Sequence, residues 1–175
     1  ISKKSTLNLE QKHTIGKYAS SLIMPGDFVY LDAGTTVEIM AGYITEKNAN
    51  YVTNSVWQAK ALSKRDISVT VIGGTFKAVT EAIIGSEAVE CLQKYHFTKG
   101  FFGTNGISDI AHFSTPEANE ASVKRTAITR CKQSYVLADS TKFDKVSAVT
   151  FGYIENSTII TTQLAPRNYN NTIYV

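Results

Sequence analysis

Apolar residues along this chain recur with two alternating periods. Residues 28–33, "FVYLDA", are rich in aromatic and β-branched side chains and predict a strand. The segment that follows places Val37, Met40 and Ile44 at the i, i+3, i+7 spacing of an amphipathic helix. The same change from strand to helix repeats along the chain.

Together these periods predict an α/β fold. Strands are expected at 28–33, 50–54, 67–74, 78–85, 99–106 (running into a Gly-rich loop), 134–139, 148–152, 157–162 and 172–175, and helices at 35–47, 55–64, 86–95 and 115–132, with a first helix around Ile15, Ala19 and Leu22. Strands alternating with helices imply a mostly parallel sheet flanked by helices. Apolar runs such as "VYL" and "VTVI" fit strands that are buried on both faces.

Residues typical of helix caps occur at the predicted starts of two helices, the first helix and the long helix at 115–132. Asn8 and Gln11 have the spacing of a capping pair and are expected to open the first helix. Thr115 and Pro116 fit the N-cap and N1 positions of the long helix. These signals set the expected first residues of both helices.

Small polar residues follow five of the predicted strands. They are "DAGTT" (32–36), "TNS" (53–55), "GGT" (73–75), "GTNG" (103–106) and "ADSTKF" (138–143). One such end is ordinary turn chemistry. Because ligands bind at the carboxyl ends of parallel strands, five together favour a cleft for a polar ligand.

"DAGTT" has two compatible interpretations. Thr35 and Glu38 fit a capping box, with Gly34 allowing the tight turn. The same helix start, with two hydroxyls and free N–H groups, would bind a phosphate. Asp32 would repel phosphate, so we expect it to hold the loop or a sugar hydroxyl. The pattern is neither a P-loop nor GxGxxG, so no nucleotide is indicated.

Charged residues near the predicted cleft leave alternatives open. Glu120 and Lys124 are four apart on the long helix, which is typical of a surface ion pair. Alternatively, Lys124 faces the cleft as a counter-charge for phosphate, and Lys142 has the same two interpretations. His112 is the one histidine expected near the cleft, where it would be a general acid or base or simply solvated.

Composition narrows the class of protein. The chain has 175 residues, 43% hydrophobic and 19% charged, which suggests one globular domain. A net charge of +3 with scattered Lys and Arg argues against a nucleic-acid surface. Cys91 and Cys131 have no metal-ligand spacing, so we expect no metal and no disulfide, in a reducing cytoplasm. No apolar run approaches the ~20 residues of a membrane span.

Ordered motifs connect the chain to a known family. In sequence they are "LIMPGDFVYLDAGTT", "VTNS", "VIGGTFKAVTEAIIG", "KGFFGTNGIS", "STPEANEASVKRTAI" and "YVLADSTKF". In this order, from about Lys17 to Thr162, the chain resembles the C-terminal effector-binding domain of DeoR-type transcriptional repressors. It looks most similar to the fructose and lactose/tagatose operon repressors of Gram-positive bacteria.

The resemblance implies a fold and a set of ligand-binding residues. The fold would be that of sugar-phosphate isomerases and CoA transferases, and the ligand a phosphorylated sugar acting as inducer. The implied effector- and phosphate-binding residues are Asp32, Gly34, Thr35, Thr36, Thr53, Asn54, Ser55, Gly73, Gly74, Gly103, Thr104, Asn105, Gly106, Glu120, Lys124 and Lys142. Asp139 and Ser140 belong to the last signature, beside Lys142. No catalytic residue and no cofactor are implied.

The resemblance also implies partners and competing functions. Fructose 1-phosphate is the first candidate ligand and tagatose 6-phosphate the second. The family binds operator DNA through an N-terminal helix-turn-helix, which does not fit before residue 28. The chain begins at Ile1 rather than Met, so we expect residues 1–175 to be the effector-binding domain of a longer, homo-oligomeric repressor. The alternative is a sugar-phosphate isomerase or deaminase on the same scaffold.

Overall fold

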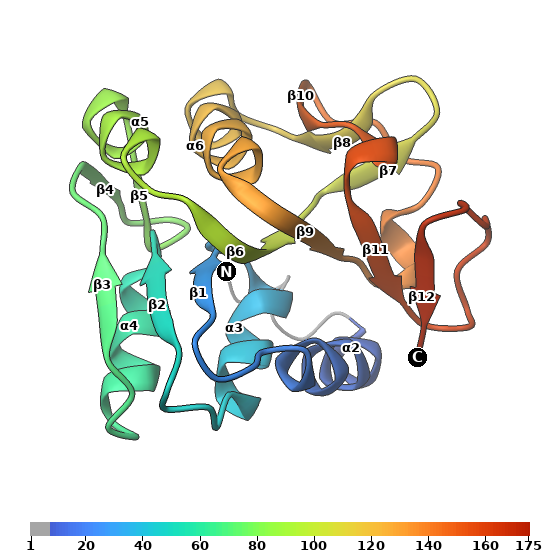
Figure 1. Ribbon diagram of the computed structural model, residues 1–175. Coiled ribbons are helices and arrows are strands. Elements are labelled where there is room, and N and C mark those ends of the chain that lie inside the picture. Colours follow the sequence, from blue (N-terminus) through green and yellow to red (C-terminus); the bar gives the residue numbers. More distant parts are fainter. Residues whose placement is uncertain (1–7) are drawn as a thin grey trace.

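Seven parallel strands form one sheet through the centre of the molecule (Figure 1). The computed structural model describes residues 8–175. The strands are β1 (Phe28–Leu31), β2 (Asn50–Thr53), β3 (Val69–Val71), β6 (Phe97–Gly103), β9 (Cys131–Leu137), β11 (Thr158–Thr161) and β12 (Thr172–Tyr174). They lie in the order β12-β11-β9-β6-β1-β2-β3, and every pair is parallel. The predicted α/β fold with a parallel sheet is therefore confirmed.

The order of the strands places a crevice at the middle of the sheet. From β1 the chain moves outward to β2 and β3, then returns to the other side of β1 with β6 and continues outward to β12. This reversal is a topological switch point, where the loops after β1 and β6 leave in opposite directions. The carboxyl ends of β1 and β6 are thus the expected place for a ligand.

Helices cover both faces of the sheet (Figure 1). They are α2 (Leu9–Ser21), α3 (Thr35–Tyr43) and α4 (Val56–Ser63) on one face, and α5 (Ser86–Gln93) and α6 (Ala118–Thr129) on the other. A hydrophobic core lies on each face of the sheet, and successive residues of β1 pack into them alternately. Val29 and Leu31 pack on the side of α2 and α3, and Tyr30 packs on the side of α5 and α6.

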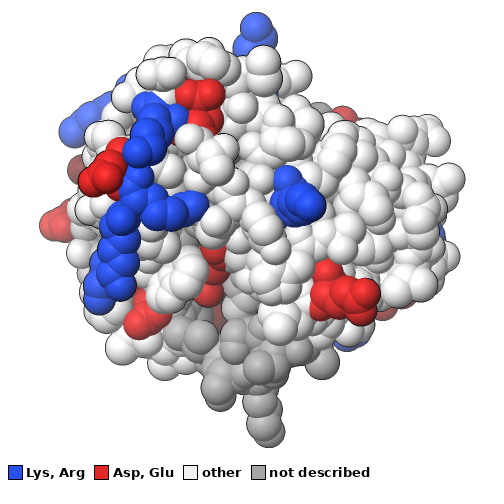
Figure 2. Space-filling view, turned by 90° about the horizontal axis from the view of Figure 1, so that it is seen from below, with Lys and Arg blue, Asp and Glu red and all other residues white. Residues whose placement is uncertain are grey.

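The face covered by α2, α3 and α4 carries charges of both signs (Figure 2). Lys and Arg side chains gather along the edge on which α4 lies, with Asp and Glu between them. Helix α4 and the turn after it carry Lys60, Lys64 and Arg65. Because the signs are mixed, this view shows no broad basic surface of the kind that binds nucleic acid.

Two small antiparallel sheets were not predicted. Strands β4 (Thr75–Lys77) and β5 (Ala82–Ile84) form a hairpin, and β7 (Gly106–Ser108), β8 (His112–Thr115) and β10 (Val149–Gly152) form a three-stranded sheet. Two short 3-10 helices, η1 (Ser140–Lys142) and η2 (Ile154–Asn156), complete the elements. The predicted extended segment at 78–85 is instead a turn followed by β5. Its turn has no Gly or Pro, which is why the hairpin gave no signal.

Of the two capping signals predicted at Asn8 and Thr115, the one at Thr115 was wrong, while Asn8 takes the N-cap position of α2 but makes no side-chain capping bond. Thr115 pairs with Val149 at the end of β8, so α6 begins only at Ala118, after Glu117. Asn8 precedes α2 in a left-handed conformation with φ 53°, and its side chain makes no capping bond. In both places a tertiary contact outweighs the local capping preference.

None of the helices within residues 8–175 is long and apolar enough to cross a membrane.

Candidate functional site

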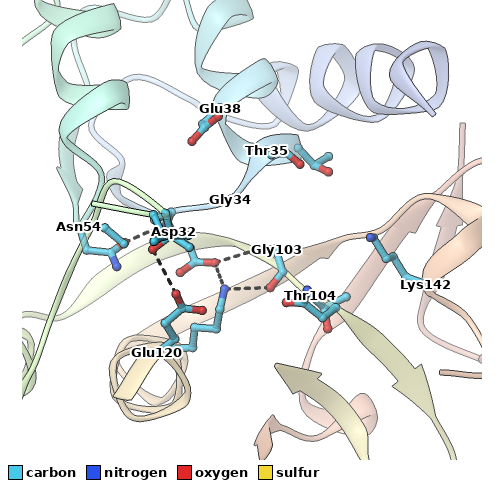
Figure 3. Close-up of a pocket in the computed structure, with 16 residues that line it drawn as sticks. Asp32, Gly34, Thr35, Glu38, Asn54, Gly103, Thr104, Glu120 and Lys142 are labelled. Atoms are coloured by element: carbon cyan, nitrogen blue, oxygen red, sulfur yellow. Dashed lines mark hydrogen bonds and ion pairs between the residues drawn. The ribbon is translucent and has the colours of Figure 1, made fainter. Parts of the chain in front are cut away.

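A pocket of about 270 Å³ opens at the carboxyl ends of β1, β2 and β6 (Figure 3). It is lined by Asp32, Ala33, Gly34, Thr35, Thr36, Glu38, Asn54, Val79, Thr80, Ala82, Gly103, Thr104, Asn105, Glu120, Lys124 and Lys142. Most residues singled out in the sequence are among them. The pocket therefore lies at the predicted switch point of the sheet.

Asp32, labelled in Figure 3, forms a buried ion pair with Lys124, and both residues line the pocket. Asp32 is 1% exposed and Lys124 is 6% exposed. The same Asp32 oxygen, Oδ2, accepts the Gly103 N–H at 3.0 Å, and the Lys124 ammonium also donates to the Gly103 carbonyl at 3.1 Å. The pair thus joins the end of β1, the end of β6 and α6. Asp32 holds a loop, which is one of the two roles expected for it.

Burial raises the pKa of Asp32 above its ordinary value, while the Lys124 ammonium and the Gly103 N–H oppose the rise. Lys124 also lies over the Phe151 ring, 5.2 Å from its centroid. The charge of Lys124 is therefore directed at Asp32 and at an aromatic face inside the protein.

The ion pair between Glu120 and Lys124, one of the two sequence interpretations, does not form. Glu120 instead accepts hydrogen bonds from Lys77 at 2.9 Å and from the Thr80 hydroxyl at 3.2 Å. Both partners belong to the hairpin region that folds over the pocket. Tertiary contacts to an unpredicted hairpin replace the local helical pair.

Helix α3 begins at the pocket without a side-chain cap. Its N-cap residue is Gly34, and the Thr35 hydroxyl accepts a hydrogen bond from Lys12 at 3.1 Å, so the predicted Thr35 cap was wrong. Among the described residues, none accepts a hydrogen bond from the N–H groups of Thr35, Thr36 or Val37. These N–H groups and the helix dipole make this end of the pocket suited to an anion.

The "TNS" segment builds the wall beside β1. Asn54 lines the pocket, and its side chain accepts the Ala33 N–H at 2.9 Å and donates to the Ile83 carbonyl at 3.2 Å. Thr53 and Ser55 lie outside the lining. Thr53 donates to a β1 carbonyl at 2.7 Å, and Ser55 caps α4. This segment therefore contributes one lining side chain and two that hold the wall in place.

Three predicted glycines also lie outside the lining. Gly73 and Gly74 form the turn between β3 and β4, where Gly74 has φ 142° and a Cβ would meet the Ile84 carbonyl oxygen at 2.7 Å. Gly106 opens β7, where a Cβ would collide with the Lys145 carbonyl. Gly74 and Gly106 therefore require glycine for the course of the chain around the pocket, whereas a Cβ on Gly73 would meet no atom within 4 Å.

The loop after β6 and the 3-10 helix η1 form the opposite wall. Thr104 donates to the Gly106 carbonyl at 2.9 Å, and Asn105 accepts from Thr115 at 3.2 Å. Lys142 closes η1, which Asp139 caps by accepting the Thr141 N–H at 3.0 Å. Lys142 lines the pocket.

The charged lining side chains lie on different sides of the pocket. In Figure 3 Lys142 lies on the side of Thr35, and Glu120 lies on the far side. Glu38, on the first turn of α3, also lines the pocket. Burial raises the pKa of Glu38, the Glu81 carboxylate adds to the rise, and the Lys12 ammonium opposes it. The arrangement can bind an anion at one end and hydroxyl groups at the other.

His112 is not among the lining residues. It lies at the start of β8, where Nδ1 is 3.7 Å from the Glu155 carboxylate and the ring contacts Tyr153 edge-on. No group of His, Cys, Asp or Glu within the described part of the chain could hold a metal ion.

A comparison with models of protein families identifies the chain. Residues 7–163 match the model of the "DeoR C terminal sensor domain", which covers most of the sequence. This chain is a DeoR C-terminal sensor domain. The resemblance seen in the ordered motifs is confirmed.

Relatives of this sensor domain include named transcriptional regulators. An uncharacterized HTH-type transcriptional regulator, FruR of Bacillus subtilis, is 41% identical over 169 residues, which cover 96% of this chain and 67% of the relative. A lactose phosphotransferase system repressor of Streptococcus mutans is 31% identical over 162 residues, covering 91% of this chain and 64% of the relative. The chain thus spans about two thirds of the length of these relatives.

Solved structures show the same fold at low identity. Ribose 5-phosphate isomerase A from Methanocaldococcus jannaschii gives a TM-score of 0.57 at 13% identity, over 78% of this chain and 55% of that one. A probable sor operon regulator from Shigella flexneri gives 0.59 at 10% identity, over 90% and 87%. The sensor domain therefore shares its fold with sugar-phosphate isomerases, as the motifs implied.

Several residues of the site escaped sequence reasoning. Val79, Thr80 and Ala82 reach the pocket from the β4–β5 hairpin, which had no turn signal. Glu38 was assigned to capping only. Lys12, on α2, is only 2% exposed. Its place three residues before Ile15, on the same helix face, could have indicated a functional lysine, because an apolar helix face seldom carries an ammonium group.

Proposed function

We propose that this DeoR sensor domain binds a phosphorylated sugar as the inducer of a transcriptional repressor of sugar metabolism. The supporting observation is the pocket with two chemically different ends. Thr35, Thr36 and Lys142 offer N–H groups, hydroxyls and an ammonium for phosphate, and Glu120 at the far side offers a carboxylate for sugar hydroxyls. A volume of about 270 Å³ suits one monosaccharide phosphate.

We propose the same candidate sugars that the resemblance in the ordered motifs implied. Fructose 1-phosphate is the first candidate and tagatose 6-phosphate the second, in keeping with the names of the FruR and lactose-system relatives. We propose that operator DNA is bound by a helix-turn-helix outside this chain, because the domain spans only part of these relatives. The protein would be a homo-oligomer in the cytoplasm, where Cys91 and Cys131 stay reduced.

An enzyme on the same scaffold is the alternative, and Glu38 is the observation that favours it. A carboxyl with a raised pKa in a pocket could move a proton at a sugar carbon. The other lining carboxylates have assigned partners: Asp32 pairs with Lys124, and Glu120 binds Lys77 and Thr80. Because no histidine is among the lining residues, we favour the sensor.

A thermal shift experiment tests the proposed ligand class. Fructose 1-phosphate, tagatose 6-phosphate, fructose 6-phosphate, the unphosphorylated sugars and inorganic phosphate are each added to the protein. A phosphosugar at roughly ten times its Kd should stabilise the fold by about 1.4 kcal/mol, and the unphosphorylated sugars should not. If no phosphosugar raises Tm, the sensor proposal is wrong. Turnover of a phosphosugar in the same samples would favour the enzyme.

Glu120→Gln tests the hydroxyl end of the pocket. The amide keeps the shape but is a weaker acceptor than a carboxylate, so affinity for the bound phosphosugar should fall about tenfold in calorimetric titration. Glu117→Gln is the matched control, because Glu117 also pairs with Lys77, at 2.5 Å, yet is not among the lining residues and is 51% exposed. Equal affinities for the two variants would contradict this orientation of the ligand.

A further inference from the structure

Helix α2 (Leu9–Ser21) contacts both segments that bound the anion end of the pocket. Lys12 donates to the Thr35 hydroxyl at the start of α3. Gln11, the preceding residue, donates to the Ser140 hydroxyl at 3.0 Å and accepts the Ser140 N–H at 2.9 Å. Ser140 begins η1, the short helix that carries Lys142 into the pocket. One turn of α2 thus bridges the two walls between which the phosphate would lie.

Further hydrogen bonds fix this turn of α2. The Asn8 amide donates to Asp139 at 3.3 Å and to Thr141 at 3.2 Å, and Gln11 accepts the Thr162 hydroxyl at 2.9 Å. Asn8 and Gln11 therefore connect α2 to the η1 segment instead of capping their own helix. Any change in the spacing of Thr35 and Lys142 would act on the first turn of α2.

Lys12 is an ammonium group buried on the apolar side of its helix. It is 2% exposed, close in sequence to Ile15 and Ala19, both 0% exposed. Burying a charge is costly unless a partner compensates for it. Lys12 donates to the Thr35 hydroxyl at 3.1 Å, and its positive charge opposes the rise in the pKa of Glu38.

Charge balance at the pocket gives this lysine a role. Among the described residues, three carboxylates, of Asp32, Glu38 and Glu120, and two ammonium groups, of Lys124 and Lys142, line the pocket. Lys124 faces Asp32, so it does little to attract a further anion. A phosphate dianion at the start of α3 would be stabilised by further positive charge behind Thr35. Lys12, one hydrogen bond behind Thr35, provides it.

We infer that Lys12 is a positioning residue for the ligand phosphate, and that α2 responds to pocket occupancy through its contacts with Thr35 and η1. This rests on the proposed function, since it assumes a phosphorylated ligand at Thr35 and Thr36. Lys12 orients the Thr35 hydroxyl so that its proton points to the phosphate, and adds a positive charge behind it. Phosphate binding tightens the link between α3, α2 and η1.

The experiment compares Lys12→Met with Lys17→Met by calorimetric titration of fructose 1-phosphate and tagatose 6-phosphate. Methionine retains most of the buried volume of Lys12, and Lys17 is an exposed lysine of the same helix. Lys12→Met should weaken phosphosugar binding about tenfold, since it removes one charge-assisted interaction, and Lys17→Met should bind like the wild type. Lys12→Arg keeps the charge and should recover part of the loss.

A second readout separates sensing from simple binding. Hydrogen exchange of amides in residues 9–21 should slow when saturating fructose 1-phosphate or tagatose 6-phosphate is added to the wild type. Lys12→Met should lose this slowing even at ligand concentrations that restore saturation. If Lys12→Met does not fold, Lys12→Gln replaces it; because glutamine is neutral but can still donate to Thr35, it should show a smaller loss of affinity, due to the missing charge alone, and wild-type affinity would overturn the role of that charge.

The outcomes distinguish the two proposals. If the wild type binds a phosphosugar and both lysine variants bind it equally, the inference on Lys12 is overturned and the proposed function stands. If α2 exchange in the wild type ignores the ligand, the sensing role of α2 is overturned. If no phosphosugar binds the wild type, the proposed function is wrong and the inference falls with it.

Discussion

Replacing Lys124 with methionine should lower the free energy of unfolding by about 3–5 kcal/mol at pH 7. The substitution leaves the Asp32 carboxylate, 1% exposed, without its counter-charge and with only the Gly103 N–H on the same oxygen. An uncompensated buried charge is among the most destabilising changes in a protein. Urea unfolding of both proteins measures the difference, and Lys132→Met, at an exposed lysine of β9, is the control.

The pH dependence of the free energy of unfolding gives a second, independent test of this prediction. The folded-state pKa of Asp32 lies above the ordinary value of 3.8. Its contribution to stability is therefore fully present below about pH 4 and is lost as pH rises through the raised pKa. Without Lys124 the pKa rises further, so the deficit of Lys124→Met should shrink between pH 7 and pH 4.

The double variant Asp32→Asn with Lys124→Met should regain much of the loss, because it removes both charges. A deficit below about 1 kcal/mol for Lys124→Met, or one that grows in acid, would show that the pair does not behave as a buried ion pair.

Thr36→Val should weaken phosphosugar binding by about 1–3 kcal/mol, or roughly 5- to 140-fold, while sparing the fold. Valine has nearly the shape of threonine but no hydroxyl, so a phosphate oxygen would lose its partner. Thr36 is 6% exposed and lines the pocket, and no other described residue hydrogen-bonds its hydroxyl. Titration with the phosphosugar that gives the largest thermal shift measures the loss.

Thr70→Val is the control for this variant, because Thr70 is an exposed residue of β3 that does not line the pocket. Unchanged affinity of Thr36→Val would place the phosphate elsewhere. A loss of unfolding free energy as large as the loss of binding free energy would instead indicate a role for Thr36 in folding.

The sequence predicted the elements of the central sheet because each carries its own period. The periodicity that predicts each element lies within a short stretch of sequence. Examples are the helix that contains Val37 and Met40 and the strand that contains Val29 and Leu31. The polar strand ends placed the pocket at the correct edge of the sheet, since the carboxyl ends of parallel strands meet there.

Partners distant in sequence could not be predicted from local patterns. One of the two sequence interpretations paired Glu120 with its helical neighbour Lys124. In the fold, Glu120 instead binds the hairpin residue Lys77, and Lys124 pairs with the buried Asp32. Thr35 was expected to cap its helix, and Lys12 takes its hydroxyl instead. In each case the outcome depends on a segment whose proximity exists only in the folded chain. For the same reason α6 begins at Ala118 and not directly after Thr115, as the capping signal had predicted.

The pairing of β1 with β6 has a consequence for how the protein folds. Asp32 and Gly103, which both line the pocket, are 71 residues apart in the chain, and Asp32 and Lys124 are 92 apart. Contacts of such sequence separation form slowly, because a long loop must close before they contribute any stability. The ligand pocket therefore forms late, after the sheet has brought β1 and β6 together. Recovery of ligand binding after dilution from denaturant should accordingly lag behind the recovery of helical circular dichroism.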